Sequence, residues 1–454
     1  MKQYKKHLIL SAMSLLLIRA QAQEPGGNSF SLQQAIEYSL KHSPNYLNAE
    51  LDLKSAEYRK KEITGMGLPQ VSGSIDLKDY LNIPTSLLPG QIFGYPAGTF
   101  IPVKFGTKYN STVGISASQL VFSSDYIFGV KASDQFLNLS RIAISRSKSD
   151  VTAQVSKAYY NVIINKERVK YLDANIARLK KIMDDTKAYG KAGFVELIDV
   201  ERLEVQYNNL ASEREKTDRF IELSTNMLKF QMGYKLGDPI QLTDSLNVKN
   251  EVTENLPLLQ ADVSKRPEYQ LLMAQQTLLD IDVQRQKWSY MPTLAAYFSH
   301  NYNAQRQEFN LLSFDKNDPN KQWFKITILG ATLNLNIFTG FQRMNRLQQA
   351  KIASLKNKNM LANVQLGAQM EANSASVSYN NAITSFNMQK KNIELAQHVY
   401  DVVQKKYKEG VGSNLEIVNA ETSLKEAQTN YYNALFDMIV AKIDYQKATG
   451  TLVK

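Results

Sequence analysis

The sequence predicts an internally duplicated α+β fold in which very long coiled-coil helices alternate with four short amphipathic strands. Three observations support this prediction. The two halves of the chain repeat the same motifs at a nearly constant offset, each half contains a long stretch without proline, and four segments alternate apolar with polar residues. With 454 residues, of which 43% are hydrophobic and 21% charged, the chain has the composition of a folded protein.

The duplication is most visible in prolines that bracket a helix-like stretch in each half. Pro44 and Pro267 each begin a Pro-x-Tyr segment, and Pro69 and Pro292 each follow its end, both pairs being 223 residues apart. Proline is favoured in the first turn of a helix and just beyond its end. We therefore expect the same order of elements in each half: a helix, a strand, a loop, a second strand and two long helices.

The expected strands have period-two patterns with one apolar face. Tyr109 and Trp323 lie near strand ends with the parity of the apolar face, which suits an aromatic girdle at a membrane surface. A strand of a soluble sandwich explains any single one of these patterns at least as well. The strands are expected at residues of about 70–81, 109–122, 293–302 and 324–338.

The long helices decide between these alternatives. Residues 124–189 contain no proline and only one glycine, so a helix there is roughly 100 Å long at about 1.5 Å per residue, far beyond the size of a globular domain. Apolar residues recur along it with four-three spacing, as in helices packed knobs-into-holes. The long helices are expected at residues of about 124–190, 195–233, 340–409 and 414–449.

The first 22 residues have the features of a secretory signal peptide. Lys2, Lys5 and Lys6 precede an apolar run at residues 8–18, which is too short to span a bilayer, and a small-residue cleavage site follows. Removal of this segment takes away four basic residues and no acid, and so lowers the formal net charge from +11 to +7. No later segment has 18 consecutive apolar residues, so we expect no transmembrane helix in the mature chain.

The sequence contains no recognisable catalytic site. It has no cysteine, which excludes disulfides and thiol chemistry, and its mature part has three scattered histidines, His42, His300 and His398. Phosphate-binding, serine-hydrolase and zinc-protease motifs are absent. Basic and acidic residues interleave along the helices, which disfavours binding to nucleic acid. We therefore expect neither an enzyme nor a protein that requires a metal or a cofactor.

Four strands are too few to close a membrane barrel, which takes about eight or more. Open sheet edges in lipid leave backbone groups unsatisfied, at a cost of several kcal/mol each. A chain with four strands therefore either keeps its sheet in water or shares it with other copies. Three copies supply twelve strands and bring their long helices together as a tube, so this count favours a homotrimer.

With these features the chain resembles the outer-membrane efflux protein family typified by TolC. The resemblance extends from Phe30 to about Gly450. Its most specific parts are the duplicated Pro-x-Tyr helix starts and two glycine turns between long helices. It divides the mature chain into a first repeat, an equatorial connector and a second repeat, at residues 23–233, 234–265 and 266–454.

The resemblance implies an α+β membrane protein: a trimer with a 12-stranded β-barrel in the bacterial outer membrane and a coiled-coil helical tunnel across the periplasm. Such a protein is a passive exit duct for drugs, metals or secreted polypeptides. An inner-membrane pump drives the export, and a periplasmic adaptor (a membrane fusion protein) joins pump and duct. The alternative that the residues leave open is a soluble periplasmic coiled-coil scaffold or adaptor.

The family pattern also places a gate at the inner tips of the helices. Tyr407 matches the tyrosine that holds the tip of relatives shut, Asp199 matches an aspartate of the first half, and Glu416 matches an aspartate that faces the tunnel. Gly412 stands where an arginine is expected, and Asn419 where a second aspartate is expected. We therefore expect a constricting ring with one Glu416 from each chain. Alternatively, Asp199 and Glu416 only stabilise helix N-termini through the helix dipole.

The turns between the paired helices are the expected docking sites for the adaptor. A glycine followed six residues later by an acidic residue is a weak motif by itself, but this chain contains two copies, 217 residues apart and each between heptad helices. The turn residues singled out are Gly193, Gly410, Val411, Gly412 and Ser413.

Overall fold

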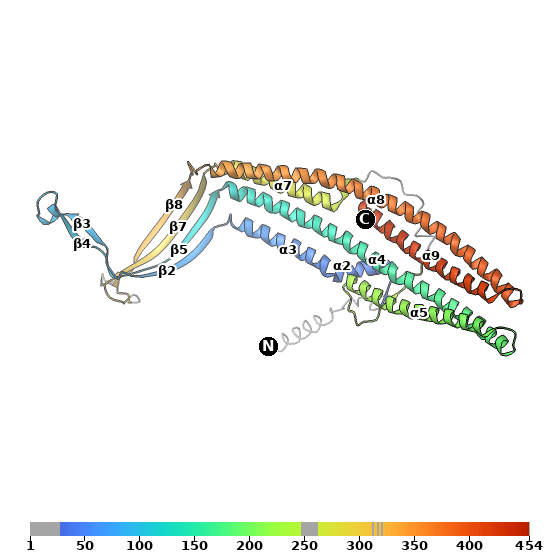
Figure 1. The fold of residues 1–454 in the computed structure, drawn as a ribbon. Helices are drawn as coiled ribbons and strands as arrows, with labels where there is room; N and C mark the ends of the chain where they lie inside the picture. The colour runs from blue at the N-terminus through green and yellow to red at the C-terminus, as the bar shows by residue number, and fades with distance from the viewer. Residues whose placement is uncertain (1–27, 247–261, 311–312, 316, 319–320, 454) are drawn as a thin grey trace, which may run out of the picture. The chain divides into compact units, whose positions relative to one another are not determined.

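The computed structural model of the chain describes residues 28–246, 262–310, 313–315, 317–318 and 321–453 (Figure 1). The expected signal peptide and residues 247–261 of the expected connector lie outside the described residues.

The described residues form two compact units, and each unit contains parts of both sequence repeats. The long helices α4 and α8, described below, contribute residues to both units. Unit 1 contains the described parts of Met1–Glu50, Ile144–Pro267 and Gln365–Lys454, and unit 2 contains the described parts of Leu51–Ala143 and Glu268–Val364.

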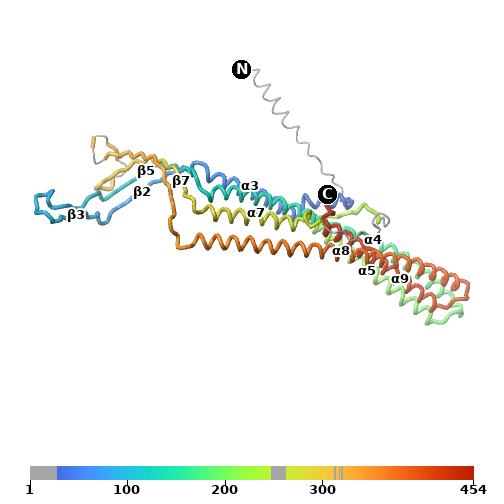
Figure 2. The backbone as a smooth tube through the Cα atoms, turned by 90° about the horizontal axis from the view of Figure 1, so that it is seen from above, coloured from blue at the N-terminus to red at the C-terminus, as the bar shows by residue number. Residues whose placement is uncertain are grey.

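Unit 1 is built around two antiparallel helical hairpins. Helix α4 (Ser124–Lys191) runs beside α5 (Leu197–Met232), and α8 (Gln342–Lys408) runs beside α9 (Asn414–Ala448), as Figures 1 and 2 show. The shorter helix α2 (Leu32–His42) packs near α5. No helix in the described part of the chain combines the length and the apolarity needed to cross a bilayer.

The buried side chains of unit 1 follow the heptad pattern. Toward the hairpin turns, Leu179 of α4, Leu203 of α5, Tyr400 of α8 and Leu424 of α9 belong to one cluster, and each is at most 1% exposed. A second cluster joins α4, α8 and α9 farther from the turns, around the fully covered Met438. The four helices therefore pack their apolar stripes into shared clusters, which confirms the predicted coiled-coil packing.

The beginning of the described chain is tied to the connector in the same unit. Strand β1 (Ser29–Phe30) pairs in parallel with β6 (Gln241–Leu242). The hydroxyl of Tyr159, a fully buried residue of α4, lies 3.0 Å from both the Phe30 carbonyl and a carboxylate oxygen of Asp244. One side chain thereby fixes both strands against the bundle.

Unit 2 contains a four-stranded antiparallel sheet in the order β2-β5-β7-β8. Helices α3 (Pro44–Gly65) and α7 (Pro267–Trp288) precede the sheet in the two repeats, and each begins at the proline that the sequence marks as a helix start. The strands are β2 (Gln70–Asp79), β5 (Tyr109–Phe122), β7 (Thr293–Arg306) and β8 (Phe324–Asn334).

The strand register gives most of the sheet one apolar and one polar face, except that Phe324, Ile326 and Ile328 of β8 lie on the polar side. Val71, Ala117, Phe298 and Leu329 are cross-strand neighbours in one row, and neighbours in a row point to the same face. The adjacent row on the opposite face is mostly serine, and there the Ser72 and Ser116 hydroxyls lie 2.9 Å apart. The apolar face is uncovered in the single chain: Val71 is 71% exposed and Leu329 is 82% exposed.

Two strand ends differ from the sequence-based expectation for a reason that the register supplies. Strand β7 continues to Arg306 because that residue still has a partner, Tyr109 of β5. Strand β8 stops at Asn334 because its partner there, Thr293, is the first residue of β7. The proline-rich segment between β2 and β5, expected to be a loop, contains the hairpin β3 (Thr85–Pro89) and β4 (Phe100–Lys104).

The shared core of unit 1 makes a prediction about stability. Leu424→Ala removes a fully buried side chain from the contact of α9 with the other helices, so we expect the free energy of unfolding to fall by about 2–5 kcal/mol. The control is Leu415→Ala on the same helix, where the leucine is 54% exposed. Thermal unfolding in detergent that gave both variants the same midpoint would contradict the assignment of this core.

Candidate functional site

Both hairpins turn through the same backbone geometry. Gly193 and Gly410 have positive φ angles of 80° and 75°, a conformation that glycine adopts without the steric cost of a Cβ. In each copy the N–H of the glycine and of the next residue donate to carbonyls three and five positions earlier, at 3.0–3.1 Å. This is the Schellman pattern of helix C-termini. The two copies of the sequence motif therefore form matching turns.

The expected docking residues of the second turn lie at the surface. Val411 is 78% exposed, and Phe194 of the first turn, which the sequence analysis did not select, is 82% exposed. Ser413 caps α9, because its hydroxyl accepts the Glu416 N–H at 3.2 Å. Each turn therefore presents an apolar side chain on a rigid backbone.

Gly412 explains why this turn cannot carry the arginine of the family pattern. A Cβ at this position would lie 2.9 Å from the Tyr407 nitrogen and 3.1 Å from the carbonyl carbon of Lys406. Such contacts with backbone atoms require the turn to shift. The departure from the family pattern is thus built into the backbone of the turn.

Tyr407 links the two hairpins. Its hydroxyl lies 2.7 Å from Oγ1 of Thr186, which is fully buried on α4. The Thr186 hydroxyl donates to the Ile182 carbonyl at 2.8 Å, so the phenol is the donor in the contact between Tyr407 and Thr186. The sequence analysis named no partner for this tyrosine, and in the structure the partner is Thr186.

Asp199 takes part in a second link through its backbone. The side-chain amide of Asn414, the first residue of α9, donates to the Asp199 carbonyl at 2.6 Å. The Asp199 carboxylate instead faces Arg202 on its own helix, at 3.3 Å. Asn414 is 6% exposed. It therefore joins α5 to α9 next to the turns, a role that sequence reasoning missed.

Glu416 lies in the first turn of α9 and is exposed. Its carboxylate forms no ion pair with any other described residue. Both the gate and the helix-dipole interpretation remain consistent with this position, since a free carboxylate serves either role.

Farther from the turns, charged residues tie α5 to its neighbours. The Glu213 carboxylate accepts from Arg168 of α4 at 2.8 Å and from Lys425 of α9 at 2.6 Å. Burial alone raises the pKa of Glu213, but hydrogen bonds and charges from Lys425 and Arg168 outweigh it and hold the pKa below its usual value. This contribution to stability is therefore present at neutral pH and is lost as the pH falls through the lowered pKa.

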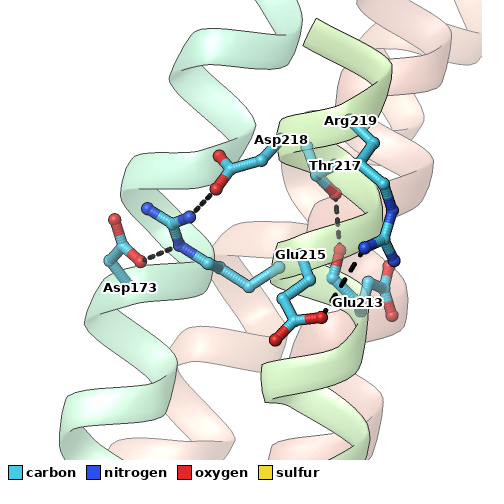
Figure 3. A network of polar contacts seen from close by, with 7 residues as sticks. Asp173, Glu213, Glu215, Thr217, Asp218 and Arg219 are labelled. Atoms are coloured by element: carbon cyan, nitrogen blue, oxygen red, sulfur yellow. Dashed lines mark hydrogen bonds and ion pairs between the residues drawn. The ribbon is translucent and has the colours of Figure 1, made fainter. Parts of the chain in front are cut away.

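Figure 3 shows a network of polar contacts next to Glu213 on α5, in which the Thr217 hydroxyl donates to the Glu213 carbonyl at 2.9 Å. Arg214 reaches across to Asp173 of α4 at 2.9 Å and also contacts Asp218. Arg219 and Glu215 form a looser pair at 3.7 Å on the solvent side. Exposed ion pairs of this kind contribute about 0–1 kcal/mol each to the stability of the fold. The half-buried Glu213, which bridges two cations, therefore stabilises the bundle more than the number of surface pairs does.

The expected aromatic girdle residues both lie at one end of the sheet. Tyr109 is the first residue of β5, and Trp323 immediately precedes β8. The ring of Phe309 meets the Tyr109 ring edge-on at a centroid distance of 5.5 Å, which adds a third aromatic residue at this end.

Crowding at Gly412 gives a prediction about stability. Gly412→Ala forces the turn backbone to move, so we expect the free energy of unfolding to fall by about 1–3 kcal/mol. Gly237→Ala is the matched control, because nothing lies within 4 Å of a Cβ there and its φ is not positive. Equal thermal midpoints for the two variants would show that the turn tolerates a side chain at residue 412.

Comparisons with known proteins agree with this geometry. Residues 267–451 match the family described as Outer membrane efflux protein. The outer membrane protein TolC of Escherichia coli (strain K12) is 21% identical over 362 residues, which cover 76% of this chain and 71% of TolC. TolC of Salmonella enteritidis is also 21% identical, over 76% of this chain and 70% of its own length.

Solved structures share the fold. The CmeC outer membrane channel of Campylobacter jejuni matches 92% of this chain and 85% of its own, with a TM-score of 0.74 and 15% identity. The outer membrane protein VceC of Vibrio cholerae matches 92% of this chain and 96% of its own, with a TM-score of 0.69 and 16% identity. Residues 267–451 thus match the outer membrane efflux protein family, and the chain as a whole is similar to TolC and shares the fold of outer membrane channels of this type.

Proposed function

We propose that this chain is the outer-membrane channel component of a tripartite export system. In this function it is a passive exit duct, and an inner-membrane pump supplies the energy. The observation that carries the proposal is the sheet of unit 2, which has one apolar face, one polar face and no further strand at its outer edges among the described residues.

The sheet edges require other copies of the chain. The outer edges of β2 and β8 present backbone groups that no described strand pairs, and such groups cost several kcal/mol each in lipid. Three chains that pair β2 of one copy with β8 of the next close a twelve-stranded barrel. Its apolar face then meets lipid and its serine-rich face lines the pore, the division of residues found in transmembrane barrels.

The hairpin turns are the proposed contact with the adaptor. Val411 and the residues around Gly193 and Gly410 are exposed on turns whose backbones are fixed by hydrogen bonds. Small fixed loops with a protruding apolar side chain suit a partner that packs helix ends. The soluble scaffold alternative explains the hairpins equally well but gives no reason for the uncovered apolar face of the sheet.

The tip is the proposed gate. Tyr407 to Thr186 and Asn414 to Asp199 both join the first hairpin to the second, so opening by separation of the hairpins must break both hydrogen bonds. Three Glu416 carboxylates then converge in the closed trimer and favour cations over anions.

Detergent extraction and bilayer recording test the proposed function. We expect the full chain to fractionate with membranes, to require detergent, to migrate as a heat-sensitive trimer and to form discrete channels in planar bilayers. Salt extraction of a monomer without channel activity would favour the soluble scaffold.

Removal of the tyrosine hydroxyl tests the gate. Tyr407→Phe deletes one interhelical hydrogen bond, worth about 1 kcal/mol or roughly a five-fold change in an equilibrium, so we expect a higher open probability in planar bilayers. Tyr189→Phe is the control, because Tyr189 is 54% exposed near the first turn. An unchanged open probability in Tyr407→Phe would remove this residue from the gate.

Charge at the constriction is tested separately. Glu416→Gln removes three converging charges from the trimer, so we expect the cation-to-anion permeability ratio to fall several-fold in reversal-potential measurements. Glu409→Gln, which removes an exposed carboxylate from the neighbouring turn, is the control. The same ion preference in Glu416→Gln and wild type would leave Glu416 with only the helix-dipole role.

A further inference from the structure

Glu421 is a buried acid that the proposed gate does not use. It lies on α9 between Ile417 and Leu424, within the apolar cluster of the hairpin end, and is 3% exposed. Neither of its carboxylate oxygens has a well-formed hydrogen bond to another described residue. A buried charge without such partners destabilises the folded state, so this position favours the neutral form of the acid.

Its surroundings supply one cation and one phenol. Arg178 of α4 lies with its guanidinium carbon 5.0 Å from the ring centre of Tyr400, which belongs to α8. Arg178 donates to Asn175 on its own helix, and Asn175 donates to Gln428 of α9 at 2.7 Å. The Arg178 Nε atom is buried and has no partner among the described residues.

Among the residues that the structure describes, no second cation lies close enough to balance the acid. Helix α5 contributes the apolar Leu203 and Leu210 and the phenol of Tyr207 to the same cluster, and α8 adds Asp401 beside Tyr400. On α9 itself, the nearest lysine, Lys425, is held by Glu213. Glu421 therefore meets Arg178 as its one cationic neighbour among the described residues.

The protonation state of Glu421 responds to pH near neutrality. Burial raises its pKa from 4.5 to about 7, and the opposing influences of Arg178 and Tyr400 are smaller. Burial and the charge of Glu421 also raise the pKa of Tyr400, which stays a neutral phenol. Because the pKa of this acid is raised in the packed bundle, the packed state gains relative stability as the pH falls and loses it between about 4.5 and 7 as the pH rises.

We propose that Glu421 is a proton-controlled latch on the tip: the neutral acid keeps α9 packed against α4 and α8, and the carboxylate favours separation of the hairpins. The latch rests on the proposed channel function, because it assigns a physiological input to the same gate. Separation hydrates Glu421 and lets the carboxylate leave its apolar surroundings. Asn414 lies about two helical turns before Glu421 on α9, and Tyr407 lies on α8 across the hairpin turn. Separation of the hairpins therefore loosens both of their hydrogen bonds as well.

The size of the effect follows from linkage. An acid that titrates near 7 when packed and near 4.5 when hydrated shifts the ratio of open to closed tips by about ten-fold between pH 6 and pH 8. Glutamine has the shape of the neutral acid and does not ionise. Glu421→Gln is therefore expected to keep the tip closed at both pH values.

The test uses two readouts on the full-length trimer. The chain contains no cysteine, so spin labels at Ala192→Cys and Val411→Cys report the distance between the two turns by pulsed electron resonance in detergent. Planar-bilayer recording at pH 6 and pH 8 reports open probability. The variants are Glu421→Gln and the control Glu426→Gln, which removes an exposed acid from the same helix.

The latch predicts a wider label distance at pH 8, by about 1–2 Å or more, and an up to ten-fold higher open probability in wild type and Glu426→Gln. It predicts no pH dependence of either quantity in Glu421→Gln. A wild-type label distance that is the same at both pH values would overturn the latch, even if the variant did not fold. Absence of channels at every pH would instead overturn the proposed function, because the label distance requires no membrane.

Discussion

The constraint on which the structure depends is the pair of open edges of the four-stranded sheet. Strands β2 and β8 offer backbone donors and acceptors along their outer sides, and no other described strand meets them. Their apolar face is also bare, with Ile75 80% exposed. A single chain thus leaves unsatisfied both the hydrogen-bonding groups and the apolar surface that a membrane protein must pair or cover. In the proposed trimer, edge-to-edge pairing of strands satisfies the hydrogen-bonding groups, and lipid covers the apolar face.

The helical unit is under a different constraint. In the proposed function it must be firmly packed and yet able to open at the hairpin turns. Leucine and tyrosine side chains fill the core, and near the turns polar contacts also join the hairpins: Tyr407 with Thr186, Asn414 with Asp199, and Arg178 near Glu421. Polar contacts exchange readily with water, so separation there costs less than separation of an apolar core. The tip is accordingly the part of the bundle best suited to move.

Sequence alone predicted the elements that depend on local pattern. Heptads, prolines and glycines mark helix starts, lengths and turns, and the alternation in β2 marks its apolar face. Contacts that depend on how two helices far apart in the sequence align could not be predicted from the sequence. Thr186 and Tyr407 are 221 residues apart, and nothing local distinguishes Thr186 from other polar helix residues. Glu421 likewise resembles a solvated charge until three helices are packed around it.

Cross-linking between chains tests the edge-to-edge closure most directly. The full chain has no native cysteine, so one cysteine at Ser74 in β2 can be combined in turn with single cysteines along β8, from Lys325 to Leu333. The account predicts that oxidation in membranes yields a covalent trimer for the positions that face each other across the closed edge, and none for the others. Monomers at every position would contradict the claim that the sheet is completed by neighbouring copies.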